Sequence, residues 1–224
     1  MRIGFDIDGV LANFTTAFIQ ETIRIAGKNL FLPEDSRNPP DWNYHLTRGY
    51  TEEEIKPVFA SIAASPNFWL DLKEEPGCST LRMCILDLQR FHDVYFVTNR
   101  QGEDAKWQTE QWLLLHLGIE RPTVLISKEK GLVARALKLD CYLDDNLENA
   151  NDVVLRTLPS PVKILCGVPS CKSLPQPDDS PSCRTYLLDR SYNQSRGPGN
   201  GPQDDRVTRV KSVGEFLDYE LKNF

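Results

Sequence analysis

The chain of 224 residues lacks the features that typify membrane and nucleic-acid-binding proteins. No apolar run approaches the roughly 20 residues that span a bilayer, and the N-terminus has no apolar stretch like that of a signal peptide. The net charge is -6 and basic residues are mixed with acidic ones, so no cationic tract could follow a nucleic-acid backbone. We expect a soluble, cytoplasmic protein that acts on a small molecule and binds neither membranes nor nucleic acids stably.

Cysteine and histidine do not occur in the patterns that bind zinc. The six cysteines include no CxxC pair, and no histidine near the C-terminal cysteines completes a ligand set. The three histidines, His45, His92 and His116, are scattered and carry no predicted role. The sequence leaves open whether the chain forms a homodimer.

Short apolar runs rich in strand-forming residues alternate with segments of helical period. This alternation predicts an α/β fold with a parallel sheet. The helical segments include one from about 103 to 117 that ends at Gly118, and a last one from about 212 to 221. The predicted strands cover residues 3–7, 94–97, 124–126, 141–143 and 162–166, with a further short strand at 185–188.

The connection between the first two strands is too long for a simple crossover. It opens with a predicted helix from about 11 to 26, continues through a proline-rich loop, and reaches a second helix that ends near residue 64. Thr51 and Glu54 form a capping box at the start of that second helix. We expect residues 14–76 to form a small helical cap, inserted into a catalytic core of residues 1–13 and 77–224.

Residues 169–206 are dense in proline, serine, glycine and aspartate. Only the strand at 185–188 interrupts this composition, so we expect mostly mobile loop there. The five residues after that strand, 189–193, are predicted to be a surface loop, although they could approach the functional site.

Polar side chains follow three of the predicted strands. The first strand ends in Asp6-Ile7-Asp8-Gly9, the second in Thr98-Asn99-Arg100 and a later one in Asp144-Asp145-Asn146. In open α/β sheets, ligands bind outside the carboxyl ends of the strands. We therefore expect these three segments to meet at one edge of the sheet.

Four carboxylates, from Asp6, Asp8, Asp144 and Asp145, would gather at that edge. Two unit charges about 4 Å apart repel by roughly 4 kcal/mol at an effective dielectric constant near 20, so a cation must offset them. The available ligands are oxygens, which suit a hard ion. The sequence thus predicts a Mg²⁺ site.

These residue types can also hydrolyse a phosphate monoester. Asp6 could attack phosphorus to form an aspartyl-phosphate, and Asp8 could protonate the leaving oxygen and then activate water. Gly9 would permit a sharp turn, while the Thr98 hydroxyl and nearby backbone amides would hold phosphate oxygens. Lys128 and Lys130 could each supply positive charge; we favour Lys130 because Gly131, at the start of the next helix, follows it.

Each element has a simpler explanation when it is taken alone. Asp and Gly favour turns, Asp144 to Asn146 could cap a helix, and Thr98 could satisfy backbone groups at a strand end. Arg100 could bind a second anionic group or pair with a neighbouring acid. The order of the elements, each at a strand end, favours the catalytic interpretation.

Four segments, FDIDGVLANF, VYFVTNR, ISKEKG and CYLDDN, resemble in order the four motifs of the haloacid dehalogenase superfamily. Its members are mostly phosphatases with a three-layer Rossmann-like core and inserted caps. The resemblance implies that Asp6 is the nucleophile and a Mg²⁺ ligand, and that Asp8 is the acid/base with its carbonyl on the metal. It further implies Thr98 on the phosphate, Lys130 as counter-charge, and Asp144 with Asp145 on the metal.

The segment NFWLDLKEEPG, before the second strand, is similar to the 5′(3′)-deoxyribonucleotidases and related bacterial and phage proteins. This resemblance implies a nucleoside 5′-monophosphate as substrate. The chain departs from the animal enzymes by having Asn99-Arg100 after Thr98; we assign Asn99 to the phosphate and Arg100 to the substrate pocket. Aromatic residues are expected to line the base pocket, namely Phe14, Phe18, Trp42, Phe68 and Trp69.

Two alternatives to a nucleotidase remain at this point. One is a phosphatase of another small phosphoester, such as a sugar phosphate. The other is a binding protein that keeps the fold without turnover. Asp8 argues against the second alternative, because a protein that only binds has no use for a proton-handling carboxylate.

Overall fold

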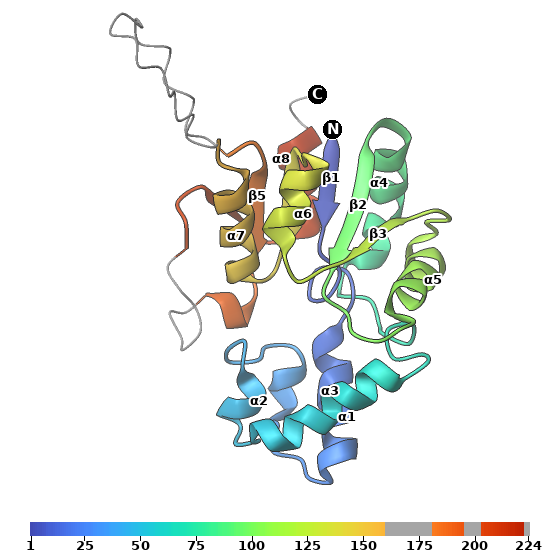
Figure 1. The fold of residues 1–224 in the computed structure, drawn as a ribbon, viewed down its shortest axis with the longest axis vertical. Helices are drawn as coiled ribbons and strands as arrows, with labels where there is room; N and C mark the ends of the chain where they lie inside the picture. The colour runs from blue at the N-terminus through green and yellow to red at the C-terminus, as the bar shows by residue number, and fades with distance from the viewer. Residues whose placement is uncertain (160–180, 195–202, 222–224) are drawn as a thin grey trace, which may run out of the picture.

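A parallel sheet forms the centre of the protein in the computed structural model, which describes residues 1–159, 181–194 and 203–221 (Figure 1). Its six strands follow the order β3-β2-β1-β4-β5-β6, and every pair is parallel. This is the strand order of Rossmann-type sheets. The predicted α/β, Rossmann-like architecture is therefore confirmed. The strands are β1 (Arg2–Phe5), β2 (Asp93–Thr98), β3 (Thr123–Ile126), β4 (Cys141–Asp144), β5 (Arg184–Leu188) and β6 (Val207–Val210).

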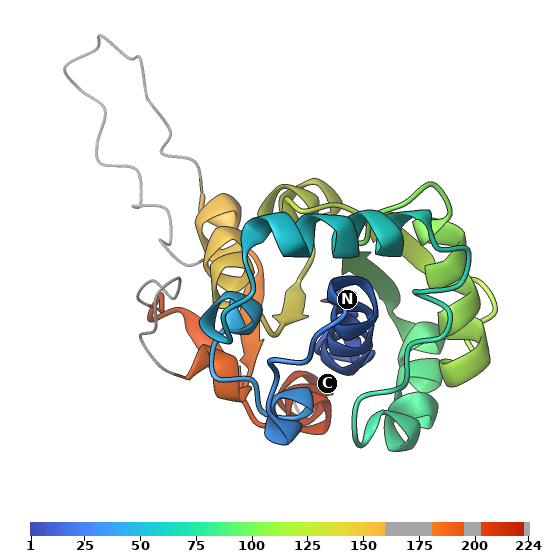
Figure 2. The same ribbon diagram turned by 90° about the horizontal axis from the view of Figure 1, so that it is seen from below.

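Helices cover both faces of the sheet and complete three layers (Figures 1 and 2). On one face Phe5 packs against Phe216 of α8 with ring centroids 5.4 Å apart, and the same core cluster includes residues of α4 and α5. On the other face Val97 and Tyr142 pack with residues of α6 and α7. The core helices are α4 (Cys78–Phe91), α5 (Ala105–Leu117), α6 (Lys130–Leu137), α7 (Leu147–Thr157) and α8 (Val213–Leu221).

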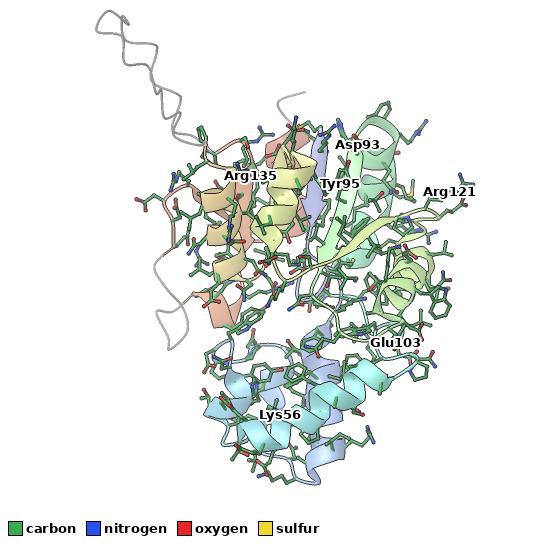
Figure 3. All side chains as sticks on the ribbon, in the orientation of Figure 1. Lys56, Asp93, Tyr95, Glu103, Arg121 and Arg135 are labelled. Carbon is green, nitrogen blue, oxygen red and sulfur yellow. The ribbon has the colours of Figure 1, made fainter. Side chains whose placement is uncertain are left out.

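The remaining helices lie beyond the carboxyl ends of the strands (Figure 1). Side chains of the cap helices and of the core extend into the space between the cap and the sheet (Figure 3). This placement supports our proposal that residues 14–76 are a cap. The cap elements are α1 (Phe14–Ala26), η1 (Pro33–Ser36), α2 (Tyr44–Thr47) and α3 (Glu52–Ala64).

Local signals in the sequence are confirmed at several ends of helices. The capping box forms, because Glu54 N donates to Thr51 Oγ1 at 3.3 Å and Thr51 N donates to Glu54 Oε2 at 3.0 Å. Gly118 ends α5 in the left-handed region with φ +70°. The prediction that the first helix begins near residue 11 was wrong. It begins at Phe14, because the Asn13 side chain accepts from Thr16 N and caps the helix there.

The return from cap to core is fixed to α5. Gln108 on that helix accepts from Trp69 N at 2.9 Å and donates to Ser65 O at 2.9 Å. Trp112, one turn further on, donates to Leu72 O at 2.7 Å. Side chains of α5 therefore hold the backbone of the connecting segment against the core.

The two strands predicted in the C-terminal part of the chain, at 162–166 and 185–188, have different outcomes. The strand at 185–188 is confirmed as part of β5, while β6 was not predicted. The predicted strand at 162–166 lies outside the described residues. Among the helices that the structure describes, none is long and apolar enough to cross a membrane.

Candidate active site

The turn after β1 brings Asp6 and Asp8 to the carboxyl edge of the sheet. The amides of Leu11 and Ala12 both donate to Ile7 O at 2.8 Å and close this turn, in which Gly9 has φ +77°. A Cβ atom on Gly9 would stand 1.9 Å from Asp145 Oδ2. Glycine is therefore required at position 9 both by the backbone and by the close approach of the loop after β4.

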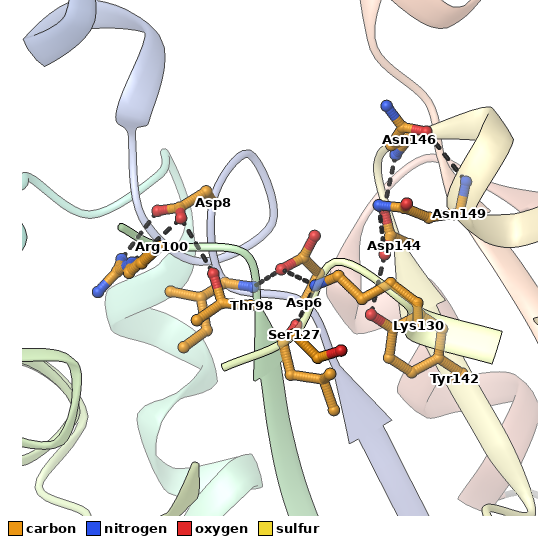
Figure 4. Close-up of polar contacts among 12 residues, drawn as sticks. Asp6, Asp8, Thr98, Arg100, Ser127, Lys130, Tyr142, Asp144, Asn146 and Asn149 are labelled. Atoms are coloured by element: carbon orange, nitrogen blue, oxygen red, sulfur yellow. Dashed lines mark hydrogen bonds and ion pairs between the residues drawn. The ribbon is translucent and has the colours of Figure 1, made fainter. Parts of the chain in front are cut away.

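Lys130 is the lysine that contacts Asp6 (Figure 4). Its Nζ donates to Asp6 Oδ1 at 3.0 Å and also to Val97 O, and its side chain is buried at the first residue of α6. Ile7 N donates to the same Asp6 oxygen at 2.7 Å. Burial raises the pKa of Asp6 to about 8, although the Lys130 ammonium acts in the opposite direction. Lys128 is exposed and does not share this contact.

Asp8 is held by Arg100 and Thr98. The guanidinium donates from Nε to Asp8 Oδ2 at 3.0 Å and from Nη2 to Asp8 Oδ1 at 2.8 Å, while Thr98 Oγ1 donates to Oδ2 at 3.1 Å. Arg100 is buried, lies over the Trp69 ring at 5.0 Å, and donates a further hydrogen bond to Thr109. Of the two roles left open for Arg100, its geometry matches pairing with a neighbouring acid.

Asp144 and Asp145 follow β4 and differ in their hydrogen bonding. Asp144 accepts from Tyr142 Oη at 2.9 Å, from Asn146 N at 2.8 Å and from the Asn149 side chain at 3.2 Å. Asp145 Oδ2 accepts from Tyr192 Oη, whereas Asp145 Oδ1 is buried and has no hydrogen-bond partner in the described part of the chain. Burial raises the pKa of both carboxyls, that of Asp145 to about 7.

These carboxylates fit a divalent cation. Asp6, Asp144 and Asp145 each offer an oxygen, and the three atoms lie within 4.8 Å of one another. When ionised, these three carboxylates carry three negative charges, and Lys130 offsets one of them. The remainder matches the charge of Mg²⁺, and the unpartnered Asp145 Oδ1 supplies a free ligand atom. The side chain of Asp8 lies with Arg100, so only its backbone carbonyl remains as the expected ligand at this position.

A cavity of about 550 Å³ lies between this carboxylate edge and the cap. Asp6, Asp8, Asn99 and both candidate lysines line its core side, as does Thr98, whose hydroxyl faces Asp8. Four of the predicted aromatic residues line it as well: Phe14, Phe18, Trp42 and Trp69. Phe14 and Trp69 stack with ring centroids 5.8 Å apart.

Two predicted pocket residues do not reach this cavity. Among the described residues that line it, neither Phe68 nor Arg100 is included. Phe68 packs edge-on against Trp69 with ring centroids 5.0 Å apart, and Arg100 is directed to Asp8. The pocket assignment of these two residues is therefore corrected: each lies behind a residue that does line the cavity.

Sequence reasoning missed polar groups on the cap side of the cavity. Asp41 Oδ1 and His45 Nδ1 are buried without a hydrogen-bond partner within the described ranges, and both residues line the cavity. Burial lowers the pKa of His45 and favours its neutral ring. Asp41 and His45 are single residues that belong to no periodic pattern, so only the folded chain reveals them.

The prediction of a surface loop at residues 189–193, after β5, was also wrong. Tyr192 and Asn193 are buried rather than exposed in a surface loop, and Tyr192 lines the cavity. Asn193 Nδ2 donates to Asp145 O at 2.8 Å and to Leu188 O at 2.7 Å. These contacts draw the segment inwards onto the loop that carries Asp145.

Comparison with known families agrees with this geometry. The family model described as 5′ nucleotidase, deoxy (pyrimidine), cytosolic type C protein matches residues 1–170. The chain belongs to this 5′-nucleotidase family. It is accordingly a phosphatase of the haloacid dehalogenase superfamily, as the four motifs indicated. No curated relative matches the chain.

Solved structures share the fold of this 5′-nucleotidase family member at low sequence identity. A protein described as a haloacid dehalogenase-like hydrolase from Burkholderia xenovorans has 11% identity and a TM-score of 0.55, with 99% of this chain and 96% of that chain covered. A hydrolase from Pseudomonas syringae has 14% identity and a TM-score of 0.53, covering 100% and 99%. A hydrolase from Deinococcus radiodurans, solved with bound phosphate and sodium, has 12% identity and a TM-score of 0.51, covering 99% and 95%.

Proposed function

We propose that the chain is a Mg²⁺-dependent 5′-nucleotidase, which hydrolyses nucleoside 5′-monophosphates, deoxyribonucleotides among them, through a phosphorylated Asp6. One observation carries the proposal. Carboxylates of a buried cluster line one cavity together with Lys130 and with aromatic residues of the cap. The charged groups suit a phosphate group and the aromatic ones suit a flat, apolar ring.

In the first step, Asp6 displaces the nucleoside from phosphorus. Both hydrogen bonds recorded for this carboxylate in the described residues end on Oδ1, which leaves Oδ2 to attack. A bond forms between Oδ2 and phosphorus and the bond between phosphorus and the ester oxygen breaks. Asp8, which enters this step protonated, gives its proton to that leaving oxygen and regains one from water in the second step. Mg²⁺ held by Asp6, Asp144 and Asp145 would favour the ionised nucleophile and offset phosphate charge.

In the second step, water releases the phosphate. Asp8 takes a proton from the water, whose oxygen bonds to phosphorus as the bond to Asp6 breaks. A carboxylate has about four acceptor positions, and Asp8 uses three of them for Arg100 and Thr98. Its Oδ1, which accepts only from Arg100 Nη2, retains a position for the transferred proton.

The cap side of the cavity would bind the nucleobase. Phe14, Trp42 and Trp69 offer ring faces or edges, and Asp41 Oδ1 with His45 Nδ1 offers polar atoms that a base edge could satisfy. Stacking of a base on an aromatic ring contributes roughly 1–3 kcal/mol. A sugar phosphate without a base would leave both the stacking and these polar groups unused.

A panel of phosphate monoesters, assayed with Mg²⁺ and with EDTA, tests the proposal. We expect nucleoside 5′-monophosphates to be hydrolysed fastest, and only with the metal. Faster hydrolysis of sugar phosphates would reject the nucleotide assignment. Nucleotide binding without any phosphate release would instead favour a binding protein. Acid quenching with labelled substrate should trap phosphate on the wild type and none on Asp6→Asn.

A further inference from the structure

The segment Asp189–Asn193 lies beyond residue 170, where the match to the family ends, yet it packs against the active site. Its short helix η2 (Ser191–Asn193) is held in place by hydrogen bonds from a residue of β6. Arg209 on that strand donates to Asn193 Oδ1 at 3.1 Å and to Asn193 O at 2.8 Å. The sheet itself therefore fixes the position of this segment.

Tyr192 gives Asp145 a defined orientation. Its hydroxyl donates to Asp145 Oδ2, while the other oxygen, Oδ1, is buried without a partner among the described residues. A free carboxylate rotates about its terminal bond and presents either oxygen. The tyrosine removes that freedom and dedicates one oxygen to a ligand.

The same segment also supports the turn that carries the proposed nucleophile. Arg190 donates from Nε to Gly9 O at 2.9 Å and forms an ion pair with Glu75 at 3.2 Å. Asn193 meanwhile holds the backbone of Asp145. Three residues of one short segment thus contact the loops that follow β1 and β4.

A third set of contacts connects the segment to the cap. The Tyr192 ring packs edge-on against Trp42 with centroids 5.6 Å apart, and Ser191 Oγ donates to Pro39 O at 2.9 Å. Tyr192 therefore touches a proposed metal ligand through its hydroxyl and a cap residue through its ring.

We propose that Tyr192 is a positioning residue for the Mg²⁺ ligand Asp145, and that it sets the affinity of the cation site. The proposal rests on the proposed function, because it presumes that Asp145 binds Mg²⁺. Residues that orient a metal ligand typically change metal affinity or activity by about 10–100-fold when they are replaced.

Tyr192→Phe tests this role, because it removes the hydroxyl and retains the ring that packs on Trp42. We expect Mg²⁺ to bind this variant about tenfold more weakly than the wild type in calorimetric titrations without substrate. The Mg²⁺ concentration that half-saturates activity should rise by the same factor.

Tyr186→Phe is the matched control. Tyr186 lies on β5, and its buried hydroxyl donates to Glu220 Oε1 at 2.6 Å, in a contact that does not involve the carboxylate cluster. This variant loses a comparable hydrogen bond and should bind Mg²⁺ within about twofold of the wild type. A general loosening of the sheet would weaken Mg²⁺ binding in both variants, which would overturn the specific role of Tyr192.

The outcomes separate this proposal from the proposed function. Equal Mg²⁺ affinity in the wild type and Tyr192→Phe would overturn the positioning role and leave the nucleotidase intact. Absence of Mg²⁺ binding in the wild type would reject the cation site itself. The rise in melting temperature on adding a fixed Mg²⁺ concentration is a second measurement, which remains usable for a less stable variant. It should be smaller for Tyr192→Phe than for the wild type.

Discussion

The core side and the cap side of the cavity are built from different chemistry. On the core side Lys130 pairs with Asp6 and Arg100 pairs with Asp8, while Asp145 Oδ1 is buried without a partner among the described residues. On the cap side the walls are aromatic, and Asp41 and His45 each bury a polar atom without a partner in the parts of the chain described. Paired charges hold the core carboxylates in place before a ligand binds. The aromatic rings of the cap offer apolar contacts that do not depend on a fixed charge. Under the proposed function, catalysis would depend on the core side of the cavity and substrate choice on the cap side.

The largest effect is expected on the core side from Asp6→Asn. An amide keeps the shape of the side chain and cannot act as the nucleophile, so kcat should fall by about 10⁴-fold or more for every substrate. Phosphate release measures it, and thermal melting checks that the variant remains folded despite the buried Lys130. Activity near the wild-type level would remove Asp6 from its proposed role.

Arg100→Lys tests whether Arg100 serves the proposed acid/base Asp8 or the substrate. A lysine cannot form the bidentate contact with Asp8, so we expect kcat to fall by about tenfold or more while KM stays within about twofold. Steady-state kinetics with a nucleotide distinguishes the two roles. An increase in KM at constant kcat would return Arg100 to the substrate pocket.

Trp42→Ala probes the cap side, where the effect should depend on the substrate. Trp42 is 46% exposed, so its loss should cost little stability. For nucleotides, kcat/KM should fall by about tenfold through lost contact with the base. A small phosphate ester without a ring should be hydrolysed as before, and an equal loss for that ester would show that Trp42 acts through Tyr192 instead.

Asp41→Asn should alter preference among bases by a smaller factor. A carboxylate only accepts hydrogen bonds, whereas an amide also donates, so the ranking of bases should change by a few-fold. Ratios of kcat/KM across the common nucleotides measure it. The rate with the small ester is the control, and unchanged ratios would place the base away from Asp41.

The pH dependence of stability should differ in direction between the two regions. In the core, burial raises the pKa of Asp6 to about 8 and of Asp145 to about 7, so the folded state binds more protons than the unfolded state above pH 4 or so. Their contribution therefore becomes less favourable as pH rises from about 4 to 8. In the cap, the hydrogen-bonded Arg48 lowers the pKa of Asp35, whose contribution is lost on acidification instead.

Thermal melting of the wild type and of Asp145→Asn in EDTA, at a series of pH values, isolates the contribution of the core carboxyls to the pH dependence of stability. The wild type should lose melting temperature more steeply than the variant between pH 5 and 8, by a few degrees. Added Mg²⁺ should restore more stability at pH 8 than at pH 5, because it binds the ionised carboxylates. Parallel curves for the two proteins would contradict the raised pKa of Asp145.

The sequence alone predicted five of the six described strands and the residues at the edge of the sheet, because those depend on local pattern. Asp6, Thr98 and Asp144 each follow an apolar run, and parallel strands bring their carboxyl ends together. The pairing of Arg100 with Asp8 could not be predicted, since it depends on how α5 and Trp69 pack around the guanidinium. Tyr192 was missed for a related reason: its local sequence resembles a surface turn, and β6 decides where it lies.

The match to the family model ends before the last two strands of the sheet. β5 and β6 lie beyond residue 170, yet β5 pairs with β4, the strand that presents Asp144. A chain shortened to the matching residues would retain every motif, but β4 would become an exposed edge with unpaired amides and carbonyls. The residues beyond 170 therefore cover the edge of β4 and complete the sheet that the matching residues begin.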